Sequence, residues 1–319
     1  MIYKNETHKM PAGFVFWLTK AVKRMTVLSM LILILISLTI LLGGYYIQGA
    51  LEKHKSDADF KMTVQSLSAS SQEMRRREKD FFLRQDFQYA DRYYVLSDEA
   101  MRLTDQLKQS PPGDKHVQLI RSIDESLQTH NQQFGLAVLS LQNLGTNKEK
   151  GLLGELYQTT NILNNRLEGE KANSQIMNFW LKLQLIVEKA IQSGDIQDKS
   201  ATANLFTQMK LALNHQHKDL VPLLDKYLLQ VNNLILQHKT LTSEVTKLTT
   251  IFRDFELNVA SLSDFSNAST RESFNDVKAT LYTWKLYINI LTLLMAFIIG
   301  WIAIFIARKT VKYGNYDGE

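Results

Sequence analysis

The sequence predicts an all-α protein in which two membrane-spanning helices flank a long helical segment. Each end carries an apolar run without charges, and between the runs apolar residues recur at spacings of three and four, without Asn-Gly or Asp-Gly hairpin signals. About 20 apolar residues in a helix cross the ~30 Å hydrocarbon core of a bilayer. We therefore expect one transmembrane helix at residues 25–46 and a second at residues 286–307.

Basic residues border the terminal sides of both apolar runs. They are Lys4, Lys9, Lys20, Lys23, Arg24, Arg308, Lys309 and Lys312. Because Lys and Arg near a span stay on the cytoplasmic side, we expect cytoplasmic segments at residues 1–24 and 308–319. Residues 49–285 then lie outside, in the periplasm of a Gram-negative cell, and the chain is a two-pass protein of the bacterial inner membrane.

The charge of the external segment is balanced, with 29 Lys and Arg against 29 Asp and Glu in residues 49–285. The formal net charge of +5 therefore arises in the terminal flanks, and nucleic-acid binding has no compositional support. The first span is too long for the apolar part of a signal peptide, so we expect it to stay anchored in membrane lipid. The sequence has no cysteine, which excludes disulfides and thiol chemistry.

Proline and glycine clusters divide the external segment into helices. The first helix should continue from the span to about Lys108, where Ser110-Pro-Pro-Gly113 ends it. The remaining helices are expected at about 115–144, 152–192 and 199–215, and from about 224 to the second span. Whether an interruption near 261–266 divides the last of these is left open.

Helices of such unequal length need partners along their whole length. The economical arrangement is a pair of stacked four-helix bundles that share the long helices. A weak internal repeat favours it: Glu78-Lys79 is echoed by Glu188-Lys189, and Ile123-Asp124 by Leu224-Asp225, with offsets of 110 and 101 residues.

Residues 74–89 resemble a signature of the helical bimodular sensor domain of bacterial transmembrane chemoreceptors (methyl-accepting chemotaxis proteins) and related sensor kinases. The matching residues are Arg75, Arg76, Glu78, Lys79, Asp80, Phe81, Arg84, Asp86 and Tyr89. The segment Gly151-Leu-Leu-Gly-Glu-Leu156 is similar to a second family segment, and the resemblance covers residues 25–307. It implies two stacked bundles, homodimerisation, and capture of small carboxylates in one or both modules.

Two features depart from the family. Residues 182–192 stand where the second module should repeat the arginine-rich motif, and they lack its basic pair. Family members also continue after the second span into a signalling region, whereas twelve residues follow Ala307 here. The expectation is either a truncated receptor or a chain that signals through a cytoplasmic or membrane partner.

The candidate ligand-binding residues are Arg75, Arg76, Arg77, Arg84 and Tyr89. Guanidinium groups bind carboxylates with two parallel hydrogen bonds, which suits a small organic acid; Tyr89 is included through the family resemblance. Arg121, His130 and Gln133 could supply a facing wall. For the arginine cluster, the alternative interpretation is a solvated helix face. Oppositely charged residues spaced i,i+4 are typical of such a face, and they occur here as Glu73–Arg77, Arg76–Asp80 and Asp80–Arg84.

Enzyme, metal and cofactor functions find no support in the sequence. His215 and His217 are two residues apart, so they do not share a helix face, and HExxH, GxSxG and GxxxxGK[ST] motifs are absent. We therefore expect a non-enzymatic chain without metal or cofactor.

The expected function is a sensory receptor that binds a small anionic metabolite outside the membrane and relays a helix shift across it, for chemotaxis or other signal transduction. Two alternatives stay open: an accessory protein that docks a partner receptor or kinase through its external helices, and a structural membrane tether.

Overall fold

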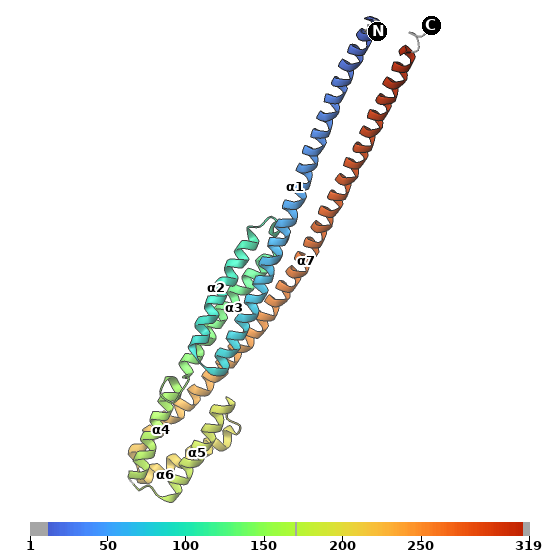
Figure 1. Cartoon of the computed structure of the whole chain (residues 1–319). Helices are drawn as coiled ribbons and strands as arrows, with labels where there is room; N and C mark the ends of the chain where they lie inside the picture. The colour runs from blue at the N-terminus through green and yellow to red at the C-terminus, as the bar shows by residue number, and fades with distance from the viewer. Residues whose placement is uncertain (1–11, 170, 315–319) are drawn as a thin grey trace, which may run out of the picture. The chain divides into compact units, whose positions relative to one another are not determined.

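The computed structural model describes residues 12–169 and 171–314, so parts of both expected cytoplasmic segments lie outside the described residues. Every element in the described ranges is helical (Figure 1). The helices are α1 (Ala12–Arg84), α2 (Phe87–Lys108), η1 (Gly113–His116), α3 (Val117–Leu144), α4 (Gly151–Gly169), α5 (Ser174–Ser193), α6 (Lys199–Gln216), η2 (Lys218–Leu220) and α7 (Val221–Gly314). The all-α prediction is confirmed.

The chain divides into two compact units. The first comprises Met1–Lys61 with Ser266–Glu319, and the second comprises Met62–Phe265. Helices α1 and α7 each contribute residues to both units, whereas α2 to α6 belong to the second alone.

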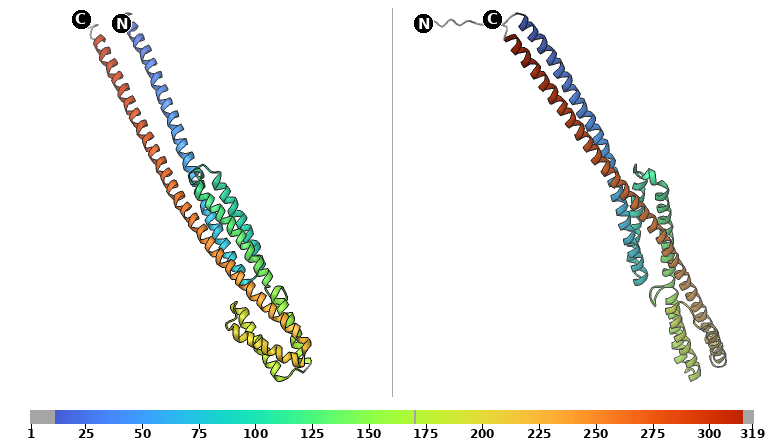
Figure 2. Two further views of the ribbon diagram at one scale, coloured as in Figure 1. Left: turned by 180° about the vertical axis from the view of Figure 1, so that it is seen from behind. Right: turned by 90° about the vertical axis from the view of Figure 1, so that its right-hand side faces the viewer.

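In the first unit, α1 and α7 run side by side (Figure 2). Both are long and apolar enough to cross a membrane, and their most apolar windows are not buried by protein. A soluble unit would leave these side chains in water at high cost, whereas lipid tails solvate them. The two predicted spans therefore have helices of the required length and composition.

Polar and aromatic contacts join the two helices of this unit beyond the apolar runs. Lys53 Nζ lies 2.8 Å from Asp276, and the hydrogen bond raises the pKa of Lys53. His54 Nδ1 lies 3.1 Å from the Ser273 hydroxyl. Within the end of the first predicted span, the Trp284 ring packs over Gly43, where a Cβ would lie 2.9 Å from Cε3, so only glycine permits this close approach.

The prediction of one helix running to Lys108 is wrong. Helix α1 ends at Arg84, and Gln85 adopts a left-handed conformation with φ of 53°. The Asp86 carboxylate then accepts a hydrogen bond from the Gln88 amide and begins α2. Helix α2 returns along α1, with the Ser70 hydroxyl donating to the Leu96 carbonyl at 3.2 Å.

A second expected helix, 152–192, is also divided. Helix α4 ends at Gly169, and Asn173 caps α5 by accepting a hydrogen bond from the Ile176 amide at 2.9 Å. In contrast, α7 is continuous through residues 261–266, which answers the question that the sequence left open.

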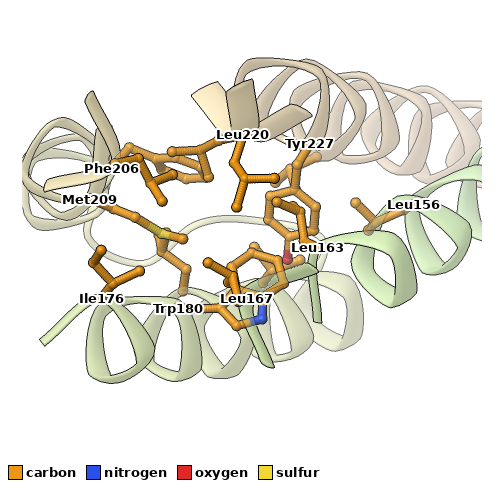
Figure 3. Packing of buried hydrophobic residues seen from close by; sticks show 14 of the residues in the cluster. Leu156, Leu163, Leu167, Ile176, Trp180, Phe206, Met209, Leu220 and Tyr227 are labelled. Carbon is orange, nitrogen blue, oxygen red and sulfur yellow. The ribbon is translucent and has the colours of Figure 1, made fainter. Parts of the chain in front are cut away.

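The second unit contains two packed groups of side chains. The first group joins α1, α2, α3 and α7 around Phe81, Tyr93, Phe134 and Phe252. The second group joins α4, α5, α6 and α7 around Trp180, whose ring meets that of Tyr227 edge-on at 5.0 Å (Figure 3). Apolar stripes of amphipathic helices form both cores. Burial of such stripes is the usual driving force of helix packing.

The internal repeat has structural counterparts. Helices α1, α2, η1 and α3 follow the same order of elements as α5, α6, η2 and α7. In the first set, Lys108 Nζ lies 2.7 Å from Asp124, and in the second, Lys210 Nζ lies 2.7 Å from Asp225. The two aspartates are the pair that the sequence aligned at an offset of 101 residues.

The α1–α2 turn can be tested by two opposite substitutions. Asp86→Ala removes the cap and should lower the free energy of unfolding by about 1 kcal/mol. Gln85→Gly relieves the left-handed conformation and should leave it unchanged or raise it by up to about 1 kcal/mol. Urea unfolding of the full chain in detergent, followed by circular dichroism, measures both; a loss of stability in Gln85→Gly would contradict this turn.

Candidate functional site

The predicted arginine cluster lies in the last turns of α1, in the second unit. Arg76 and Arg84 are exposed, with side-chain accessibilities of 70% and 59%. Arg75 and Arg77 are half-buried, at 17% and 22%. The helix therefore presents two guanidinium groups to solvent and turns two toward its neighbours.

Acidic side chains of α1 neutralise much of the cluster. Arg77 pairs with Glu73 and lies 3.8 Å from Asp80. Arg76 and Arg84 make longer contacts, each 3.9 Å, to Glu73 and Asp80 respectively. Exposed pairs of this kind contribute little to stability and exchange readily with solvent or another anion. The cluster thus combines a solvated face with cations that an anion could recruit.

Tyr89 lies on α2 and is half-buried. The Arg84 guanidinium carbon is 5.5 Å from the centre of its ring, a cation–π distance. The structure therefore brings Tyr89 to the exposed end of the arginine cluster, next to Arg84, across the α1–α2 turn.

Arg75 points into the first packed group. It pairs with Glu78 one turn further on, and its Nη2 donates to the Thr249 hydroxyl of α7 at 3.1 Å. Its guanidinium carbon also lies 5.2 Å from the centre of the Phe252 ring. Arg75 is therefore the member of the cluster that links α1 to α7.

Behind Arg75, the core contains a buried polar chain. Glu78 Oε2 lies 3.0 Å from His130 Nε2, and His130 Nδ1 lies 2.7 Å from the Tyr93 hydroxyl. These three side chains are at most 2% exposed. We call Arg75, Glu78, His130 and Tyr93 the buried chain; its members come from α1, α3 and α2.

Burial shapes the chemistry of this chain. Desolvation, with the nearby Glu78 charge, raises the pKa of Tyr93 far above its ordinary value, so the phenol stays protonated. A neutral Tyr93 can donate to His130 Nδ1, which leaves the hydrogen of a neutral imidazole on Nε2, facing Glu78. Arg75 supplies the positive charge that a buried carboxylate requires.

Sequence reasoning did not identify the buried chain. The sequence predicts either a facing wall of the ligand site or a solvated helix surface for Arg121, His130 and Gln133; Arg121 is exposed, but His130 is 1% exposed. The signal was present in the spacing, because His130 falls on the same stripe as Ile123, Leu127 and Phe134. Gln133 donates to the carboxylate of Glu244 on α7.

The second packed group contains a groove of about 630 Å³ between α6 and α7. Lys239–Asp195 and Lys210–Asp225 pairs border it, at 2.9 Å and 2.7 Å. Buried Phe206 and Leu224 line it between these pairs. No group of three His, Asp or Glu side chains suited to a metal occurs within residues 12–169 and 171–314.

Comparison with known proteins adds no relative: no family model, no curated protein and no solved structure matches this chain. The site must therefore be interpreted from its own geometry.

Glu78 should be far more important for stability than its neighbour Glu73. Glu78→Ala leaves Arg75 and His130 without their buried partner and should lower the free energy of unfolding by about 3 kcal/mol. Glu73→Ala, on the same helix but 35% exposed, should cost less than about 1 kcal/mol. Urea unfolding of both variants gives the comparison, and equal losses would show that the buried chain does not stabilise the core.

Proposed function

We propose that this chain is a membrane-anchored sensory receptor that binds a small organic anion outside the membrane and relays a helix shift through its two spans. In this proposal the two packed groups are stacked four-helix bundles, as the resemblance to helical bimodular sensor domains implies. The output is chemotaxis or another signalling pathway, reached through a cytoplasmic or membrane partner.

The observation that carries the proposal is the extent of α1 and α7. Each helix contains one candidate span and also contributes residues to the packed cores of the second unit. A ligand that alters the packing of these helices changes elements that themselves enter the membrane. Known transitions of this kind are helix shifts of about 1–2 Å, and the ligand biases them only by its differential affinity for the two states.

The chemistry of the α1 cluster supports an anionic ligand. Arg76 and Arg84 are exposed and lie 3.9 Å from the carboxylates that they face, and Arg77 lies between them along the helix. A small carboxylate with two acidic groups can replace these contacts with bidentate, charge-assisted hydrogen bonds, which are stronger. The aromatic ring of Tyr89 closes one side of this surface.

The proposal places both termini in the cytoplasm and residues 49–285 in the periplasm, and it includes a homodimer. Exposed leucines of the second unit support self-association: Leu83, Leu229 and Leu236 are 82%, 60% and 66% exposed. Leu229 and Leu236 are seven residues apart and share one face of α7, the spacing of a helix–helix seam. The same leucines suit the alternative, an accessory protein that docks another receptor or kinase.

Ligand binding can be tested by thermal unfolding of the full chain in detergent with a panel of small organic acids. A binding acid should raise the melting temperature, and Arg77→Glu should abolish the increase because it reverses a charge in the cluster. Arg102→Glu is the matched control, since Arg102 lies on α2 and is 55% exposed. An unchanged increase in Arg77→Glu would remove this residue from the site; no increase with any acid would contradict the proposed ligand class.

Topology and self-association can be tested in one variant, because the chain has no cysteine. Ser122→Cys places a single thiol on an exposed position of α3, away from the leucines proposed for self-association. A membrane-impermeant maleimide should label it in intact cells with a permeabilised outer membrane, and mass photometry in nanodiscs should give the mass of a dimer. Labelling only after lysis would reverse the orientation, and a monomer mass at all concentrations would reject the dimer.

A further inference from the structure

The buried chain contains more charge than a helical core needs. Glu78 and His130 are 2% and 1% exposed in a group formed mainly by aromatic and aliphatic side chains, with small hydroxyl side chains such as those of Ser97 and Thr104. Burying a carboxylate is costly unless its charge is compensated, and apolar side chains of similar volume often stabilise a core better. Its presence therefore calls for a role besides packing.

The contacts of Glu78 suggest what that role is. One carboxylate oxygen pairs with Arg75, and the other faces His130 Nε2 at 3.0 Å. The two facing atoms are buried, lie outside hydrogen-bond geometry and have no other hydrogen-bond partner among the residues the structure describes. Glu78 is thus firmly held on the arginine side and only loosely held on the histidine side.

We propose that Glu78 and His130 are positioning residues that couple anion binding at Arg75 to proton uptake by His130. This inference rests on the proposed function and places a carboxylate of the anion at Arg75, the half-buried member of the arginine cluster. Without a ligand, Glu78 holds the Arg75 guanidinium. An anion that takes over Arg75 leaves Glu78 without its positive partner inside the core, and a protonated His130 then provides the compensating charge.

The proton balance follows from the contacts of the imidazole. A neutral His130 carries its hydrogen on Nε2 and accepts from Tyr93 at Nδ1, so the incoming proton from solvent binds Nδ1. The Tyr93 hydroxyl, which can donate or accept, then accepts from Nδ1–H. The imidazolium directs its Nε2–H toward Glu78, and one proton is taken up for each anion bound.

The surroundings of His130 support this exchange. The charged and titratable groups facing it from the described part of the chain are Glu78 and, behind it, Arg75 on α1, and Tyr93 on α2. Helix α7 faces it with the ring of Phe252, 5.3 Å away, and contributes no charge to this contact. Glu244 of α7 is held by Gln133 on α3.

Linkage sets the direction of the pH dependence. Because the bound state holds one more proton than the free state, anion affinity should rise as pH falls, by at most about tenfold per pH unit. Helix positions should change with it, since α1, α3 and α7 all meet at Arg75 and His130.

The test is isothermal titration calorimetry of the full chain in nanodiscs with succinate, at two pH values and, at each pH, in two buffers of different ionisation enthalpy. Wild type should take up protons on binding. His130→Gln, whose amide can still reach Glu78, should bind succinate without proton uptake and with an affinity independent of pH. His215→Gln, on the exposed end of α6, is the control and should behave as wild type.

Glu78→Gln provides a second, independent variant whose helicity is checked by circular dichroism. It removes the carboxylate that competes for Arg75, so succinate should bind more tightly and without proton uptake. Proton uptake that persists in His130→Gln or in Glu78→Gln would overturn the coupling while leaving the receptor proposal intact. If wild type binds neither succinate nor any other organic acid, the proposed function fails, and this inference fails with it.

Discussion

The backbone hydrogen bonding that a membrane span requires is the constraint that the two long helices satisfy. Hydrocarbon offers no partner to an N–H or C=O group, so a single chain crosses it as a helix. In this protein the two helices that meet the requirement continue beyond their apolar segments, α1 to Arg84 and α7 from Val221. In water such rods are stable only if other helices cover their apolar stripes, and α2 to α6 provide that cover.

The two packed groups repeat one order of elements but differ in their cores. With the offset of 101 residues, Ile123 corresponds to Leu224 and Phe134 to Ile235, so apolar positions stay apolar. His130 corresponds to Val231, which is 1% exposed. The first group therefore keeps a buried polar chain at a position where the second has an aliphatic side chain. This difference makes the first group the better candidate for a regulated site.

The arginine cluster makes two kinds of contact, within α1 and between helices. Most of its charge is matched by Glu73, Glu78 and Asp80 on the same helix, as expected for a solvated helix surface. The contacts are not equivalent, however. Those of Arg76 and Arg84 are long and exposed, whereas Arg75 connects α1 with α7 and, through Glu78, with α3. An anion that competes for Arg75 therefore acts on the contacts that join α1, α3 and α7.

The sequence by itself determined the helical class, the two apolar segments and most helix ends marked by proline or glycine, because these depend on local composition and spacing. It did not determine the break at Gln85, whose left-handed conformation no glycine signals, or the break that follows Gly169. It named the pairs of Arg77 with Glu73 and of Arg84 with Asp80, but not the contacts that Arg75 and Glu78 make with other helices, since the tertiary structure decides which side chains meet the buried face of α3. His130 becomes part of a buried chain because α1, α2 and α7 enclose that face, and no local pattern of charges records such an enclosure.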